Sequence, residues 1–148
     1  LWKDAHSVRM TQGGHGCVKQ RTRGWLEQDA IDREPPFMLL SIDRGAMEEG
    51  RGGDTKRTTK VRFPRFLEQG AWLQSGTYEC VAVICHWGSQ ASVGHFTAYC
   101  SVNQASGEFA RFDDGKEPTS SVGWRALEQD DVRRNAQLFL YARTKVST

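Results

Sequence analysis

The chain has 148 residues, of which 38% are hydrophobic and 26% are charged, a composition typical of one soluble globular domain and not of a disordered chain. Its formal net charge of +2 is too small to indicate a nucleic-acid partner, and no apolar run approaches the length of a membrane span. We therefore expect neither nucleic acid nor a membrane among its partners.

The cysteines occupy positions 17, 80, 85 and 100, and no Cys-x-x-Cys pair occurs among them. This spacing argues against a disulfide framework and against a zinc site. Cys80 and Cys100 lie inside β-rich runs, where a reduced thiol behaves as a small hydrophobic side chain. The sequence thus predicts a reducing compartment, the cytosol or the nucleus, and neither a metal nor another cofactor.

The first 34 residues are polar and poorly periodic, which predicts an irregular arm. The chain starts with neither an initiator Met nor a signal-peptide pattern, so we expect it to be part of a longer protein. Pro35 and Pro36 then interrupt the chain. The short apolar run Phe37–Ile42 that follows predicts a buried strand.

Two further segments precede the most regular part of the chain. Residues 45–54 contain four glycines and no apolar periodicity, which predicts an exposed, mobile loop. Residues 58–63 alternate between polar and apolar side chains and end at Pro64, which predicts a strand that the proline terminates.

The second half of the chain is rich in β-forming residues. Strands are expected at Tyr78–Trp87, residues 95–102, Glu108–Phe112 and Ala136–Arg143, and a short helix at residues 124–133. Tyr78–Trp87 is apolar on both faces at its centre, which favours a position inside the sheet. The predicted fold class is mainly β, of the α+β type, with an antiparallel sheet and one short helix.

His95 begins the second of these strands, and Asp113 and Asp114 follow the third. Strand ends at one edge of an antiparallel sheet are neighbours, so we expect an imidazole nitrogen of His95 within hydrogen-bond reach of one of the two carboxylates. An imidazole held by a carboxylate is the base-and-orienter part of a nucleophilic triad. Asp114 could equally be a turn residue before Gly115, with no role in catalysis.

Four motifs in this region carry a resemblance. They are Tyr-x-Cys-Val-Ala-Val-Ile-x-His-x-Gly from Tyr78, Gly-His-Phe-Thr-Ala-Tyr from Gly94, Phe-Asp-Asp from Phe112, and Ala-Gln-Leu-Phe-Leu-Tyr-Ala-Arg from Ala136. Their order and spacing resemble the C-terminal half, with the His and Asp boxes, of the ubiquitin-specific protease family of cysteine deubiquitinases. The resemblance implies the palm part of a papain-like fold: residues 35–148 would be the His/Asp half, and residues 1–34 a degenerate finger region.

By the same resemblance, the protein would hydrolyse the peptide or isopeptide bond at the C-terminal glycine of ubiquitin, with His95 as general base and Asp113 orienting it. Its partners would be ubiquitin, or a ubiquitin-like modifier, and a ubiquitinated protein. The loops at 45–54 and 88–94 would close over the ubiquitin tail. The residues implied in substrate binding are Gly88, Gly94, Phe96 and His86.

The nucleophile is missing, because the family's Gly-Asn-x-Cys pattern does not occur in the sequence. Cys17 lacks that context, and nothing around Cys85 indicates an activated thiol. Two interpretations remain: the His/Asp half of a larger protease whose cysteine precedes Leu1, or a catalytically inactive module that binds ubiquitin-like proteins. Either way, this chain alone is expected not to cleave a ubiquitin substrate. A third reading is a metal site, which lacks zinc-type spacing; its ligands would be Cys85, His86, His95 and Cys100.

Overall fold

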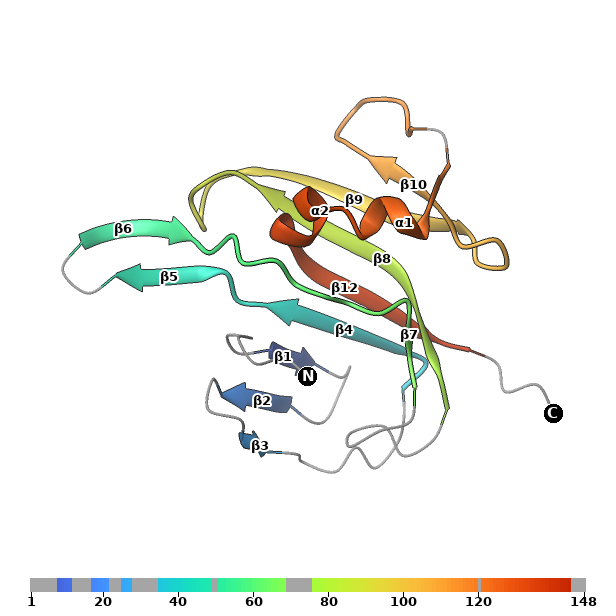
Figure 1. Cartoon of the computed structure of the whole chain (residues 1–148), viewed down its shortest axis with the longest axis horizontal. Coiled ribbons are helices and arrows are strands. Elements are labelled where there is room, and N and C mark those ends of the chain that lie inside the picture. The colour runs from blue at the N-terminus through green and yellow to red at the C-terminus, as the bar shows by residue number, and fades with distance from the viewer. Residues whose placement is uncertain are drawn as a thin grey trace. The chain divides into compact units, whose positions relative to one another are not determined.

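The computed structural model describes residues 8–11, 17–21, 25–27, 35–48, 51–68, 76–119 and 121–144, and the side chains of 35–45, 54–68, 76–119 and 121–144. The chain divides into two compact units, each built from separate stretches of sequence. Their strands and helices are shown in chain order by colour in Figure 1. No helix of the described residues is long and apolar enough to cross a membrane.

The first unit contains the residues up to Asp43, Phe63–Val81 and the residues from Leu138 onward. Its strands pair antiparallel in the order β12-β4-β1-β2-β3, and β7 pairs with the start of β8. The strands are β1 (Val8–Thr11), β2 (Cys17–Arg21), β3 (Trp25–Glu27), β4 (Phe37–Ile42) and β7 (Phe66–Leu67), with the first four residues of β8 (Tyr78–Trp87) and the last six of β12 (Ala136–Arg143).

The core of this unit is built on apolar side chains that come from separate stretches of the chain. On β4, Met38 and Ile42 are buried whereas Phe37 and Leu39 are exposed. The strand, which was expected to be buried, therefore buries the side chains of one of its two faces only. Two buried tyrosines find hydrogen-bond partners for their hydroxyl groups within this unit. Tyr78 donates to the carbonyl of Pro35 at 2.6 Å, and Tyr141 donates to the carbonyl of Pro64 at 2.7 Å. The other buried members are Phe63, Leu67, Cys80 and Phe139.

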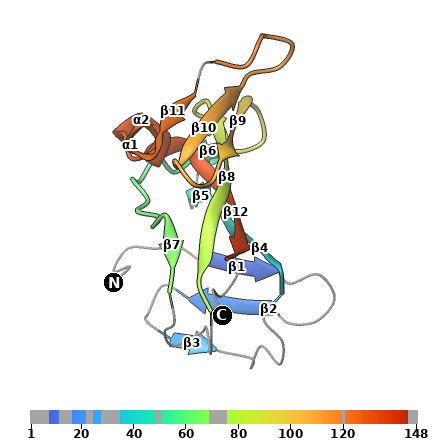
Figure 2. The same ribbon diagram turned by 90° about the vertical axis from the view of Figure 1, so that its right-hand side faces the viewer.

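The second unit contains Arg44–Arg62 and Ala82–Gln137. Here β9 (His95–Asn103) pairs antiparallel with β8 on one side and with β10 (Glu108–Phe112) on the other, and β10 pairs with β11 (Val122–Gly123). The turned view shows β9 and β10 side by side (Figure 2). The register puts one set of buried side chains on a single face of this sheet, namely Val83, Cys85, Thr97, Tyr99 and Phe109.

Two helices follow β11 where one was expected: α1 (Trp124–Leu127) and α2 (Asp130–Asn135). The prediction of one continuous helix is wrong because Gln129 takes an extended conformation, with φ −64° and ψ 149°. The sequence of α2 suits a fresh start, since it has two acids in its first turn and two arginines in its last, which complement the helix dipole. Leu127 and Val132 are the buried residues of the two helices.

The segment 45–54, expected to be a mobile loop, instead forms most of a β-hairpin, so that prediction is wrong. Strand β5 (Gly45–Glu48) pairs antiparallel with β6 (Arg51–Lys56). Strands pair through main-chain hydrogen bonds, which do not require an alternation of apolar side chains. The glycine-rich sequence lacks that alternation, so it gave no sign of the hairpin. Contacts from β6 to distant residues, described below, supply the rest of its support.

Residues 58–63, expected to be a strand, belong to none of the described strands, and Arg44 explains why. The guanidinium of this buried residue donates to the carbonyls of Arg57 and Thr59 at 3.0 and 3.1 Å. The same group donates to the carbonyls of Arg133 and Ala136 at 3.0 and 2.8 Å. Within residues 58–63 the fork thus takes the carbonyl of Thr59, and the amide and carbonyl of Val61 bond to Arg133, so these groups have partners without a neighbouring strand.

The other fold predictions divide clearly. The expected fold class is confirmed, since the structure is mainly antiparallel sheet with little helix. The strands expected at Tyr78–Trp87, Glu108–Phe112 and Ala136–Arg143 have those bounds. The prediction of an irregular arm is wrong for the described part of residues 1–34. Strands β1, β2 and β3 lie there, and β1 pairs antiparallel with β4. The correspondence of this stretch to a finger region stays a prediction.

Candidate active site

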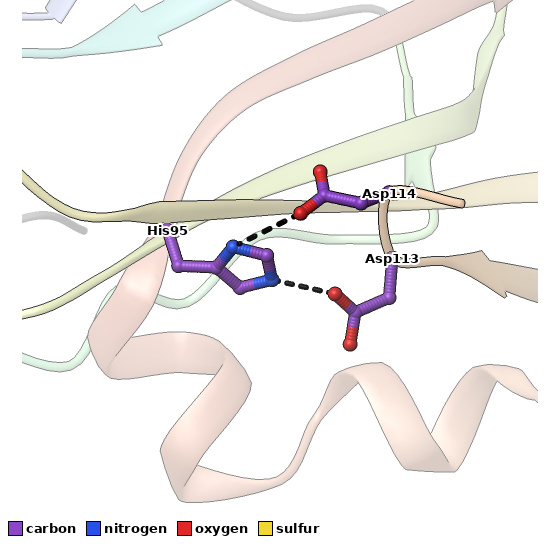
Figure 3. A group of neighbouring side chains, drawn as sticks. All are labelled: His95, Asp113 and Asp114. Carbon is purple, nitrogen blue, oxygen red and sulfur yellow. Dashed lines mark hydrogen bonds and ion pairs between the residues drawn. The ribbon is translucent and has the colours of Figure 1, made fainter. Parts of the chain in front are cut away.

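The proposed base lies at the junction of two paired strands. His95 begins β9, where it pairs with Trp87 of β8, and Asp113 comes directly after β10. Because Phe112 pairs with Ala98, the end of β10 meets the start of β9. The Nε2 atom of His95 lies 2.5 Å from Oδ1 of Asp113 (Figure 3). The expected imidazole–carboxylate pair is therefore present, and its chemical roles stay predictions.

Asp114 approaches the opposite edge of the same ring. Its Oδ2 lies 3.6 Å from Nδ1 of His95, so the imidazole sits between the two acids (Figure 3). Successive residues of a strand point to opposite faces, but Asp114 has a positive φ of 50° and leaves the strand geometry. The two side chains differ in exposure, 15% for Asp113 and 78% for Asp114.

Asp113 is held by more than the histidine. Its second oxygen, Oδ2, accepts from Lys116 Nζ at 3.0 Å and from a guanidinium nitrogen of Arg111 at 3.3 Å. The hydrogen bonds from Lys116 and then from His95 lower the pKa of Asp113 below its usual value. The carboxylate is thus kept ionised, with Oδ1 left for the imidazole.

Arg111 and Lys116 were not among the residues predicted for the site. For Arg111 a signal existed, because a residue two positions before Asp113 on an extended strand shares its face. For Lys116 the sequence offers no such periodicity, since the contact depends on the turn made by Asp114 and Gly115.

His86 lies in the interior beside the candidate site. Its ring is 2% exposed and stacks on Phe96, with centroids 4.5 Å apart and an interplanar angle of 13°. Burial, followed by the nearby Lys56 cation, lowers the pKa of His86. The neutral ring therefore packs beneath Phe96, which is itself 53% exposed. A role of either residue in substrate binding stays a prediction.

Gly88 and Gly94 bound the loop between β8 and β9, and each position requires glycine. Gly88 has a φ of +130°, which side chains rarely adopt. At Gly94, a Cβ atom would lie 2.1 Å from Nε2 of His86 and 2.3 Å from the carbonyl oxygen of Trp87. The local backbone explains both glycines, and their part in substrate binding also stays a prediction.

The described thiols do not provide a nucleophile. Cys80, Cys85 and Cys100 are in the reduced state, outside any disulfide, and burial raises the pKa of Cys85 to about 12. Burial also raises the pKa of Cys100. A thiol is nucleophilic as its thiolate, so neither side chain is activated. The side chain of Cys17 lies outside the described part of the chain.

The metal site considered from the sequence does not form. On paired strands Cys85 and His95 lie on one face of the sheet, whereas His86 and Cys100 lie on the other, so the four side chains cannot converge. Among the described residues, one group could hold an ion by proximity: His95, Asp113 and Asp114, whose ligand atoms lie within 4.8 Å of one another. The hydrogen bonds of His95 and Asp113, with the ion-pair contact of Asp114 at 3.6 Å, already account for these three side chains.

The sequence of the chain is similar to that of one known protein family. The sequence model of one protein family, described as "Ubiquitin carboxyl-terminal hydrolase", matches residues 6–141. Ubiquitin carboxyl-terminal hydrolase 10 of Saccharomyces cerevisiae is 27% identical over 112 residues, or 72% of this chain and 14% of the relative. Ubiquitin carboxyl-terminal hydrolase 26 of Arabidopsis thaliana is 27% identical over 118 residues, or 76% of this chain and 10% of the relative.

A solved structure shares the fold. It is described as "Structure of the Ubp8-Sgf11-Sgf73-Sus1 SAGA DUB module" and matches with a TM-score of 0.61 at 22% identity, covering 80% of this chain and 26% of the other. The chain thus spans 10% to 14% of the length of the two curated relatives.

Proposed function

Because the chain belongs to the ubiquitin carboxyl-terminal hydrolase family, we propose that it forms the His/Asp part of a thiol-dependent deubiquitinase. The reaction is hydrolysis of the peptide or isopeptide bond that joins the C-terminal glycine of ubiquitin, or of a ubiquitin-like modifier, to a protein. The yeast and plant relatives are named ubiquitin carboxyl-terminal hydrolases. The reduced cysteines of the described part suit a reducing compartment, the cytosol or the nucleus.

His95 acts as the general base of this reaction. The observation that carries the proposal is the 2.5 Å contact between His95 Nε2 and Asp113 Oδ1. With the Nε2 proton donated to the carboxylate, the lone pair of the ring lies on Nδ1. Nδ1 takes the proton of a cysteine thiol, and the thiolate attacks the carbonyl carbon of the terminal glycine. The imidazolium then gives its proton to the leaving amine, and water hydrolyses the thioester.

Asp113 orients the imidazole and stabilises its protonated form. The two cations on Oδ2 leave Oδ1 directed at the ring. The nucleophilic cysteine is contributed by a part of the protein outside this sequence, as expected from the absence of a Gly-Asn-x-Cys stretch. Residues 45–54 and 88–94 cover the extended tail of ubiquitin, with Phe96 beside them.

A second candidate function is a non-catalytic module that binds ubiquitin or a ubiquitin-like protein. The observation in its favour is the chemistry of the described thiols, since the pKa of Cys85 lies at about 12 and no activated thiolate is found among the described side chains. In this alternative the His95–Asp113 pair has a structural task alone.

The deciding experiment uses the protein extended upstream to include its candidate cysteine. Turnover of a fluorogenic ubiquitin amide is measured for the extended protein and for His95→Ala, and ubiquitin affinity is measured in parallel. Loss of the base is expected to reduce kcat by about 10³-fold, while affinity for ubiquitin changes little. Asp113→Asn is expected to give a smaller loss. Lys60→Gln is the control, because Lys60 pairs with Asp130 and not with the candidate site.

The outcomes separate the two functions. Equal turnover by His95→Ala and the unsubstituted protein would refute His95 as the base. An extended protein that binds ubiquitin but shows no turnover before any substitution would favour the binding module.

A further inference from the structure

Strand β6 is joined to the loop at residues 88–94, which leads directly into His95. Thr55 forms an isolated antiparallel bridge with Gln90. On either side of this bridge, the amide of Lys56 donates to the carbonyl of Ser89 at 2.9 Å, and the amide of Ala91 donates to the carbonyl of Asp54 at 3.4 Å. The loop therefore continues the hairpin as a third, short extended segment.

One side chain closes this junction. Oδ2 of Asp54 accepts a hydrogen bond from the amide of Ser92 at 2.7 Å and a second from the hydroxyl of the same residue. Charge-assisted bonds to a backbone amide are among the stronger hydrogen bonds of proteins. The hydroxyl and then the amide of Ser92 lower the pKa of Asp54.

The strand that carries Asp54 is itself anchored. The Lys56 side chain, 5% exposed, donates to the carbonyl of His86 and to Oδ1 of Asn135, the latter at 2.7 Å. At the other strand of the hairpin, Arg44 directly precedes β5, and its guanidinium donates to four main-chain carbonyls. The start of β5 and the end of β6 are thus each held by a buried, hydrogen-bonded cation, so β6 offers the loop a rigid support.

The loop transmits this support to the histidine over a short path. Ser92 is three residues before His95, and Gly94 between them packs so closely on His86 that no side chain fits. The start and end of the loop also approach each other, since a Cβ atom on Gly88 would lie 3.3 Å from the carbonyl oxygen of Val93. Fixing Ser92 therefore leaves little freedom for the backbone that places the imidazole.

We propose that Asp54 is a positioning residue for His95: its carboxylate fixes Ser92 against β6 and thereby holds the imidazole in line with Asp113. Asp54 touches neither the imidazole nor its carboxylate partner in this role. The inference rests on the proposed function of His95 as a base, but the contact network and its test do not require activity.

The test uses NMR on the 148-residue chain. Amide hydrogen exchange of Ala91 and Ser92 reports the junction, and the imidazole resonances of His95 report its placement against Asp113. The variants are Asp54→Ala, Asp54→Asn and Ser92→Ala. Matched controls are Glu117→Gln, an exposed acid of the same unit, and Ser89→Ala, which keeps the carbonyl that Lys56 uses. Circular dichroism verifies that each variant is folded.

Asp54→Ala is expected to speed exchange of the Ser92 amide by about tenfold or more, because it removes the acceptor of that amide. The same substitution shifts and broadens the His95 imidazole signals. Asp54→Asn, which keeps an oxygen acceptor, restores part of the protection, and the two controls leave both readouts unchanged.

Two results would overturn the proposal. Unchanged exchange at Ser92 in Asp54→Ala would show that the carboxylate does not fix the loop. Faster exchange with unchanged His95 resonances would show that the loop is fixed by Asp54 without positioning the imidazole. If Asp54→Ala does not fold, Ser92→Ala decides the matter with the Ala91 amide and the His95 signals. Loss of catalysis in the extended protein is scored separately, so failure of the proposed base does not mimic either result.

Discussion

The imidazole of His95 and the carboxylate of Asp113 meet at 2.5 Å, although 18 residues separate them in the chain. One oxygen of Asp113 faces the ring and the other faces two cations, so the pair is oriented from both sides. This relationship leads to the first of five measurable expectations.

Asp113 is expected to titrate below its usual pKa, because hydrogen bonds from Lys116 and His95 favour the carboxylate. Side-chain carboxyl ¹³C shifts followed over pH measure this directly. Lys116→Gln and Arg111→Gln should each raise the pKa of Asp113, and Lys60→Gln should not. Titration of Asp113 at its ordinary value in the unsubstituted chain would contradict the hydrogen-bond account.

The same shift fixes the sign of a stability effect. A carboxyl group whose pKa is lower in the folded than in the unfolded chain stabilises the fold at pH values above the unfolded pKa. That contribution is lost as the pH falls from the ordinary value of 3.8 through the lower folded value. Acid unfolding monitored by circular dichroism should therefore shift to higher pH in Lys116→Gln.

Arg44→Ala is expected to destabilise the chain strongly, because four main-chain carbonyls lose a buried donor at once. We expect the free energy of unfolding to fall by about 3 kcal/mol or more, measured by urea titration. Arg57→Ala is the matched control, since its carbonyl and not its side chain takes part. Arg44→Lys should recover part of the loss. A change under about 0.5 kcal/mol would refute the role of the guanidinium.

Gly94→Ala introduces a methyl group where His86 Nε2 and the carbonyl oxygen of Trp87 already lie, at 2.1 and 2.3 Å. The backbone oxygen cannot rotate away, so we expect a loss of about 2 kcal/mol or more in the free energy of unfolding. Gly115→Ala is the control, because no atom lies within 4 Å of the added carbon. Equal stability of the two variants would show that the loop before His95 is looser than the structure implies.

Cys85 is expected to resist alkylation in the folded chain. Burial raises its pKa to about 12, so at pH 8 the thiolate is roughly one part in ten thousand. Iodoacetamide labelling followed by peptide mass spectrometry should modify Cys85 only after denaturant is added. Rapid labelling of Cys85 under native conditions would reopen the possibility that it serves as a nucleophile.

The sequence by itself determined the strands that carry the candidate site. Alternation and β-branched or aromatic side chains are local properties, and they located Tyr78–Trp87, Glu108–Phe112 and Ala136–Arg143 with the observed bounds. The same strands bring the ends of β9 and β10 together, so the approach of His95 to an acid could be predicted from strand order alone. The family motifs lie on these strands, on β9 and at the strand ends, and the family is confirmed by the match over residues 6–141.

Only the tertiary structure decided what happens where the chain has no periodicity. The hairpin at β5 and β6 follows Arg44 directly, and the Arg44 side chain has acceptors at Arg133 and Ala136, which lie 89 and 92 residues away. Likewise, the sequence left Asp113 and Asp114 as rivals, whereas in the structure Asp113 bonds Nε2 at 2.5 Å and Asp114, with its positive φ, lies 3.6 Å from Nδ1. Hydrogen bonds between remote segments leave no local pattern in either partner, so propensity and spacing cannot reveal them.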